Sequence, residues 1–345
     1  MEKQEEEMHQ HVRRRPGMYI GSLGLKGVNY LITHIFEELV KGRDAKVESF
    51  AITILGNTVC SLQVRSNHDL QQFLRLFLYD YSKPFTAMFC KALRGLTSRL
   101  EINTSQAGFV FNYGIISEDL KGVNKPSDGV LLIRLELDIE IFKELKFDFY
   151  YLRNCIEEFA LLNKDMKFYI EDKRYEVVNQ NYFHFPNGIM HKMNWVCSDI
   201  YSTGYHQITI CTQMDSNYYQ IAIAWPSDWM YRRGRKISYA GNYITSENGS
   251  LIDGVMKGIY KALKKYAQDV RPDFEISFSQ FKKNDKLSIV AQVKSDELEF
   301  AGSTKDKLES GKIKSEATVI AMGMLSDYFR DNRRLPVEML SWSRK

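Results

Sequence analysis

Hydrophobic residues in the first half of the chain follow two spacings, one typical of helices and one typical of strands. At residues 27–40 they recur every three or four positions, which predicts a helix with one buried face. Alternation at residues 49–55 and 59–64 predicts two strands, and Gly56-Asn57 between them predicts a tight hairpin. Further helices are expected at residues 70–79, 85–96 and 150–162, and further strands at residues 12–21, 99–104, 109–113, 130–137 and 167–170.

Strands and helices also alternate in the second half. Strands are expected at residues 207–214 and 219–225, which flank the turn residues Asp215-Ser216-Asn217. Further strands are expected at residues 236–243, 274–281 and 287–293, and helices at residues 251–267 and from about Ser303 to Phe329, with Ser303 or Thr304 as the cap of the longer helix. The pattern changes near residues 199–204, so we expect two domains, 1–200 and 201–345. The mixture of strands and helices predicts an α+β protein whose first domain is a two-layer α/β sandwich.

Composition narrows the class of protein. The 20 Tyr and 20 Phe among 345 residues argue against disorder over most of the length. The net charge of +4, from 47 basic and 43 acidic side chains, does not by itself indicate a nucleic-acid partner. The N-terminus is acidic and no apolar run reaches the ~18 residues of a membrane span, so a cytoplasmic protein without a membrane segment is expected. The histidines and cysteines show no paired spacing that predicts a metal site.

Three segments carry a resemblance to one family. Residues 12–21 read VRRRPGMYIG, residues 242–255 read NYITSENGSLIDGV, and residues 300–308 read FAGSTKDKL. In this order they resemble segments of the B subunits of type IIA topoisomerases, namely gyrase B and topoisomerase IV B. The resemblance implies an ATPase domain of the GHKL (Bergerat) type followed by a transducer domain. It also implies that the DNA-cleavage domain of the family is not part of this sequence.

The resemblance places the family's hydrolytic residues on the first long helix. There, a Glu activates water and an Asn four residues later holds magnesium. Thr33 and Glu37 occupy these positions here. A Thr hydroxyl is a poor general base, and a second carboxylate beside three phosphates adds negative charge. Both residues are therefore expected on an ordinary helix surface, with no catalytic residue and no metal ligand among them.

The other nucleotide contacts of the family also differ. The family's adenine-binding Asp-Gly-x-Gly loop corresponds to residues 63–69, QVRSNHD, and its supporting Thr corresponds to Val130. The glycine-rich lid corresponds to residues 84–91, PFTAMFCK, which contain no glycine to let backbone N–H groups approach a phosphate. One element is retained, because Lys305 matches the transducer lysine that reaches the γ-phosphate. Lys305 is the only nucleotide-binding residue expected.

Three functions remain open. The first is a catalytically inactive paralogue that binds a type IIA topoisomerase subunit, itself or DNA, needs no cofactor, and is a monomer or a weak homodimer. The second is a divergent ATPase that uses ATP and magnesium through Glu37 or Glu38 together with Lys305. The third is a DNA-binding module that uses the basic turn at residues 231–236, YRRGRK, whose cations are Arg232, Arg233, Arg235 and Lys236.

Overall fold

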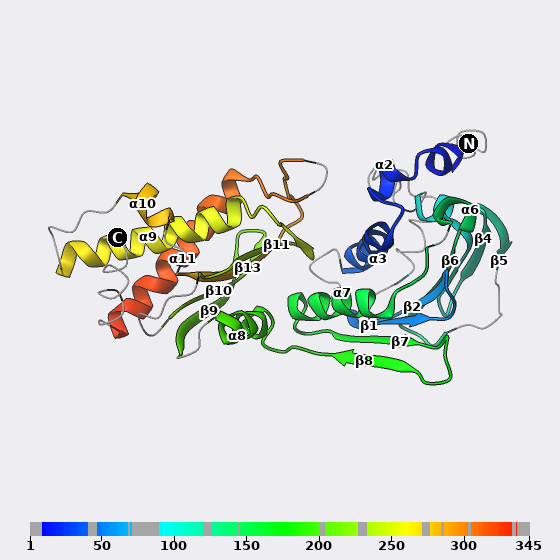
Figure 1. Ribbon diagram of the computed structural model, residues 1–345, viewed down its shortest axis with the longest axis horizontal. Helices are drawn as coiled ribbons and strands as arrows, with labels where there is room; N and C mark the ends of the chain where they lie inside the picture. Colours follow the sequence, from blue (N-terminus) through cyan, green and yellow to red (C-terminus); the bar gives the residue numbers. More distant parts are fainter. Residues whose placement is uncertain are drawn as a thin grey trace. The chain divides into compact units, whose positions relative to one another are not determined.

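The computed structural model describes residues 9–40, 47–67, 70, 90, 92–119, 126–143, 145–200, 204–226, 233–270, 277–283, 286–302, 305–332 and 336. The chain divides into two units, Met1–Pro186 and Asn187–Lys345 (Figure 1). This division lies between residues 186 and 187, earlier in the chain than the boundary near residue 200 that the sequence predicts. The difference arises because helix α8 (Ile189–Ile200) packs against strands of the second unit through buried Ile189, Met193 and Cys197.

Eight described strands of the first unit form one sheet in the order β5-β4-β3-β6-β2-β1-β7-β8. Neighbours are antiparallel except for β1 and β7, which are parallel. The strands are β1 (Val47–Ile54), β2 (Val59–Ser66), β3 (Thr97–Asn103), β4 (Gly108–Asn112), β5 (Ile115–Asp119), β6 (Val130–Leu137), β7 (Lys167–Asp172) and β8 (Asn179–Phe183). The β1–β2 hairpin predicted at Gly56-Asn57 is confirmed.

Helices cover one face of this sheet. They include α2 (Gly17–Ile20), α3 (Leu25–Val40), α6 (Ile139–Phe142) and α7 (Phe149–Leu162). Figure 1 shows α3 and α7 lying over β1, β2 and β7. Phe36 of α3 joins the two layers, since its ring lies 5.2 Å from Phe50 of β1, 5.0 Å from Phe159 of α7 and 5.5 Å from Phe168 of β7. The predicted two-layer α/β sandwich of an α+β protein is confirmed.

Residues 12–21 are largely helical, so the strand expected there is wrong. Residues 9–14 form a helical segment, and α2 follows after Pro16. Pro16 has φ −59°, the value its ring imposes and a helix requires, while Gly21 at φ +69° ends the helix in the left-handed region. Strands β5 and β8 were not expected. Most of the helices expected at 70–79 and 85–96 lies outside the described residues, although residues 92–96 are helical.

Five described strands form the sheet of the second unit in the order β12-β11-β13-β10-β9. These are β9 (Tyr205–Met214), β10 (Asn217–Pro226), β11 (Lys236–Ala240), β12 (Tyr243–Ile244) and β13 (Ser288–Lys294). Helices α9 (Ser250–Val270) and α11 (Gly311–Asp331) bury one face of the sheet, and the short helix α10 (Phe278–Lys282) packs on α9. No helix in the described ranges is long and apolar enough to cross a membrane.

Two expectations for the second unit are corrected. The described part of residues 274–281, expected as a strand, contains helix α10, because Ser277 and Gln280 form a capping box in which each side chain bonds the other's backbone N–H. The long helix α11 begins at Gly311, where the Ser310 side chain accepts a hydrogen bond from the Ile313 N–H. Ser303 and Thr304, the caps predicted from sequence, lie outside the described residues.

Helices α9 and α11 start side by side and pack closely. The Ser310 N–H donates to Ser250 Oγ at 2.8 Å, at the two N-termini. A Cβ added to Gly254 would lie 2.5 Å from the Lys314 carbonyl oxygen, and one added to Gly258 would lie 2.6 Å from the Thr318 carbonyl oxygen. Only glycine permits this approach of two backbones. Because the two backbones are this close, the Thr318 hydroxyl of α11 can donate to the Gly254 carbonyl of α9 at 3.1 Å.

The variant Gly258→Ala is expected to destabilise the second unit by about 1–3 kcal/mol, because the new methyl group overpacks the α9–α11 contact. Gly323→Ala is the matched control: Gly323 also lies within a helix, but a Cβ there meets nothing within 4 Å. This control should gain about 0.5–1 kcal/mol from helix propensity. Urea unfolding followed by circular dichroism measures both, and equal stability of the two variants would contradict the close packing.

Candidate functional site

The family's hydrolytic positions fall on α3, where Thr33 is 4% exposed. Its placement on an open helix surface, as expected from sequence, is therefore wrong. The Thr33 hydroxyl donates to the Asn29 carbonyl at 2.8 Å, one turn earlier, and is thereby used within the helix. Glu37 lies one turn later and is half-buried, while the side chain of Glu38 lies outside the described part of the chain. No three His, Cys, Asp or Glu side chains of the described ranges gather as a metal site.

The sequence resemblance places the family's adenine-binding loop at the end of β2. Here the strand continues to Ser66, paired with both β1 and β6. Alternation buries Leu62 and Val64 in the core shared with α3, whereas Gln63 and Arg65 are exposed. The side chains that β2 presents to the helix layer at this end are therefore apolar or, at Ser66, a hydroxyl. None of the described ones is a carboxylate.

Two other differences bear on the nucleotide. Val130, at the position of the family's supporting Thr, is 4% exposed and pairs with Arg65 across the β2–β6 ladder. Its isopropyl group offers no hydrogen bond. Residues 68–69 and the lid region 84–91 lie outside the described residues, apart from Cys90, which is 2% exposed.

The second and third resembling segments lie side by side in the second unit. The Glu247 N–H donates to the Asp306 carbonyl, and the Leu308 N–H donates to the Asn248 carbonyl at 3.1 Å. Gly249 has φ +105°, and a Cβ there would lie 2.1 Å from the Leu308 carbonyl oxygen. We call residues 245–250 and 305–310 the clasp. It holds the starts of α9 and α11 together.

Lys305 projects from the clasp with φ +58°, in the left-handed region. Its Nζ lies 4.1 Å from the centroid of the Tyr243 ring and 5.9 Å from that of Phe300. An ammonium group over a ring face is attracted to the electrons of the ring. The Lys305 ammonium is therefore held by aromatic side chains of its own unit.

The basic turn gains a neighbour in the structure. Arg232 and Tyr231 lie outside the described residues, while Arg233, Arg235 and Lys236 are described. Burial lowers the pKa of Lys236, and the nearby charges of Arg233 and Lys282 lower it further. Lys282 belongs to α10, far along the sequence. The fold thus brings Lys282 close to Lys236 of the basic turn.

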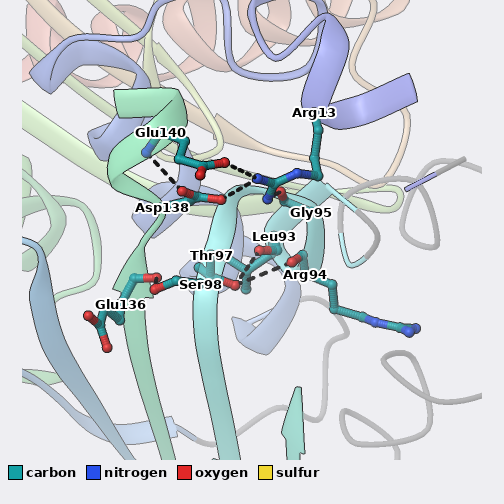
Figure 2. A network of polar contacts seen from close by, with 9 residues as sticks. All are labelled: Arg13, Leu93, Arg94, Gly95, Thr97, Ser98, Glu136, Asp138 and Glu140. Atoms are coloured by element: carbon teal, nitrogen blue, oxygen red, sulfur yellow. Dashed lines mark hydrogen bonds and ion pairs between the residues drawn. The ribbon is translucent and has the colours of Figure 1, made fainter. Parts of the chain in front are cut away.

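The arginine run of the first resembling segment has a structural role, as Figure 2 shows. Arg13 Nη2 forms an ion pair with Asp138 Oδ2 at 2.5 Å, and Arg13 Nη1 donates to the Gly95 carbonyl at 3.3 Å. Asp138 is 1% exposed and caps α6 by accepting from the Glu140 N–H. Arg13 therefore compensates a buried carboxylate.

A cleft of about 810 Å³ lies at the opposite end of β1 and β2 from the family's nucleotide positions, beside the β1–β2 turn and the start of α7. It contains an ion pair in which Arg174 Nε and Nη2 donate to the two carboxylate oxygens of Asp172, at 2.8 and 2.6 Å. Arg174 Nη1 donates to the Phe147 carbonyl at 2.9 Å. This pairing, which lowers the pKa of Asp172 through the hydrogen bond from Arg174, makes the arginine part of the scaffold.

Replacing Arg13 by Met is expected to cost about 3 kcal/mol of unfolding free energy, because Asp138 is left buried without a cation. The double variant Arg13→Met/Asp138→Asn should recover part of this loss. Arg14→Met, an exposed neighbour in the same helical segment, is the control and should change stability by about 0.5 kcal/mol or less. Denaturant unfolding measures the cycle, and additive effects of the two single changes would refute the coupling.

Comparisons of the sequence and of the fold identify known proteins to which this chain is similar. The family model for DNA gyrase B matches residues 184–344. The DNA gyrase B subunit of Clostridium acetobutylicum is 23% identical over 94% of this chain and 55% of the relative. That of Borreliella burgdorferi is 24% identical over 90% of this chain and 53% of the relative. The chain spans about half the length of the curated relatives it matches.

Solved structures show the same fold. The 43K ATPase domain of Thermus thermophilus gyrase B, in complex with an aminocoumarin, superposes with a TM-score of 0.78 at 16% identity, over 97% of this chain and 93% of that one. The ATP-binding domain of Francisella tularensis topoisomerase IV, in complex with a small-molecule inhibitor, gives 0.78 at 19% identity, over 96% and 94%. The chain is thus similar to the B subunits of type IIA topoisomerases, and its α+β fold is that of the matched ATP-binding domains.

Proposed function

We propose that this chain is a catalytically inactive relative of gyrase B that acts in DNA topology by binding. Its partners are another type IIA topoisomerase subunit or DNA, and it works in the cytoplasm as a monomer or a weakly associating homodimer. The observation that carries the proposal is the Thr33 hydroxyl. It occupies the position of the family's catalytic Glu, is buried, and donates its proton to the Asn29 carbonyl.

Hydrolysis of ATP requires a group that activates or orients water and cations that stabilise the transferred phosphoryl group. A Thr hydroxyl bonded within its own helix is a poor group for activating water, and the apolar Val130 offers no hydrogen bond in support of adenine binding. Lys305 is the remaining family cation, and its ammonium lies over the Tyr243 ring of its own unit. These differences act together, because each removes a separate interaction with the nucleotide.

The alternative is a divergent ATPase that binds ATP and magnesium through Glu37 or Glu38 together with Lys305. Isothermal titration of the full chain with magnesium and a non-hydrolysable ATP analogue separates the two. We expect no saturable binding below the millimolar range, an unchanged result for Lys305→Ala, and a monomer mass by light scattering with or without the analogue. Micromolar binding that Lys305→Ala abolishes would establish the alternative instead.

A second candidate function is DNA binding by the basic turn. Burial lowers the pKa of Lys236, and the charges of Arg233 and Lys282 lower it further, so each of these two cations repels Lys236, while Lys282 also pairs with Asp253 at 2.8 Å. A bound phosphate backbone would relieve this repulsion. Arg235 extends the same turn, and Arg232 precedes it outside the described residues.

The double variant Arg233→Ala/Arg235→Ala is expected to weaken binding to duplex DNA. The slope of log K against log salt should fall by about 0.9 for each phosphate that the variant no longer neutralises. Fluorescence anisotropy at several salt concentrations measures this slope. The control is Arg330→Ala, an exposed arginine of the same unit that pairs locally with Asp327. Equal slopes for the double variant and the wild type would rule out this turn as a DNA-binding surface.

A further inference from the structure

The sheet of the first unit ends in two edge strands, β5 and β8, which differ in character. β5 carries the charges of Glu118 and Asp119, and Ser117 forms a bulge where its pairing with β4 shifts by one residue. Charges and bulges are the means by which edge strands avoid pairing with another chain. β8 reads NQNYF, which contains no charge and no proline, and its register with β7 is unbroken. β8 therefore lacks the features that protect β5.

The pairing of β7 shows which backbone groups of β8 point away from the sheet. The Lys173 N–H donates to the Ile54 carbonyl of β1 at 2.9 Å, so the odd-numbered residues of β7 direct their backbone groups toward β1. The even-numbered residues of β7 therefore bond the odd-numbered residues of β8, with which they are paired. The N–H and C=O groups of Gln180 and Tyr182 consequently point outward. Within the described ranges, no hydrogen bond to these outward groups is found.

As Figure 1 shows, β8 is the outermost strand at its end of the sheet, and exposed apolar and aromatic side chains lie beside its open edge. The ring of Tyr182, which is 51% exposed, lies 4.9 Å from that of Tyr169 in β7. Val177 and Val178, directly before β8, are 81% and 42% exposed. Tyrosine is enriched at protein interfaces, whereas Lys and Glu are depleted there. The edge therefore has the composition of an interface between proteins.

We propose that β8 pairs with β8 of a second copy of this chain, in antiparallel orientation about a two-fold axis at Asn181. In this register Gln180 of one copy lies opposite Tyr182 of the other, and their outward N–H and C=O groups face each other. Asn181 lies opposite its own counterpart, and its amide can both donate and accept. The register pairs all five residues of β8 and brings together the backbone groups that the sheet leaves open.

A second copy is the occupant that this edge fits, because the strand is complementary to itself. A two-fold contact uses the same surface on both chains, so any charge at the axis would oppose its own like. β8 carries none. The same register continues beyond the strand, where Val177 lies opposite Phe185 and Val178 opposite His184 of the second copy. No acidic side chain, lysine or arginine occurs from Val177 to Phe185, so the contact opposes no like charges there.

The contact is small, so the association is expected to be weak. The two opposed pairs of residues supply about four backbone hydrogen bonds, each with a modest net contribution because water is displaced. The loss of translational and rotational freedom opposes them. We expect a dissociation constant of ~0.1–1 mM, which leaves the chain a monomer at micromolar concentration. The inference rests on the proposed function, in which the chain is a monomer or a weakly associating homodimer, and assigns that homodimer its surface.

The test measures association of the full chain by sedimentation equilibrium between ~10 and ~500 µM. The wild type should be a monomer at the lower concentration and form a substantial fraction of dimer at the higher one. Asn181→Asp and Asn181→Lys each place like charges directly opposite each other at the axis, so each variant alone should associate about threefold more weakly. An equal mixture of the two should associate more tightly than either variant alone, because opposite charges then face each other across the axis.

A second variant tests the backbone contact. Gln180→Pro removes the outward N–H of each copy, and proline is tolerated at the free edge of a sheet, so the variant should fold and remain a monomer at ~500 µM. The matched control is Gln106→Asp mixed with Gln106→Lys, an exposed position between β3 and β4. Alone or mixed, these variants should associate as the wild type does. A variant that only fails to fold cannot give the gain expected for the mixture at Asn181.

Three outcomes overturn the proposal: a wild type that stays a monomer at ~500 µM, a dimer that Gln180→Pro leaves unchanged, or a mixture at Asn181 that associates no more tightly than its components. Any of them leaves catalytic inactivity intact, because the titration with the ATP analogue does not involve β8. Micromolar binding of the analogue would likewise refute catalytic inactivity without affecting the pairing of β8. A dimer that forms only with the analogue, and that the variants at Asn181 do not weaken, would contradict both.

Discussion

The second unit depends on the close approach of two helices, α9 and α11. Gly254 and Gly258 allow the backbones to touch, and no other residue type fits at either position without displacing a carbonyl oxygen of α11. The contact continues to the far end, where the Tyr266 ring packs edge-on against Phe329. Because both helices are packed on the same sheet face, this contact also fixes how the sheet is covered.

That approach explains why two segments distant in sequence act together. The clasp joins residues 245–250 to residues 305–310 immediately before α9 and α11 begin, and the helices can start side by side only if these backbones pair. Lys305 is a product of the same geometry. Its ammonium lies over the Tyr243 ring, so the cation stays beside the clasp.

The contacts that hold the first unit together differ in kind from those that a nucleotide would require. Phe36 joins α3, α7 and the sheet, and Arg13 compensates the buried Asp138. At two positions that the resemblance assigns to the nucleotide, Thr33 already donates its hydroxyl within its own helix, and the buried Val130 has no polar group. A core contact constrains only size and shape, whereas phosphate chemistry requires particular functional groups. The scaffold can therefore remain similar while the site does not.

The sequence by itself determined the α+β class, the helix at α3, the β1–β2 hairpin and the resemblance, because these depend on local periodicity or on contiguous residues. It failed at residues 12–21 and at α10, where a proline and a capping box act through backbone geometry that alternation does not detect. Only the tertiary structure decided that Thr33 is buried, that Lys305 lies on Tyr243, and that Lys282 joins Lys236. Each of these features depends on which distant segments of the chain come into contact. The spacing of side chains along the sequence does not predict those contacts.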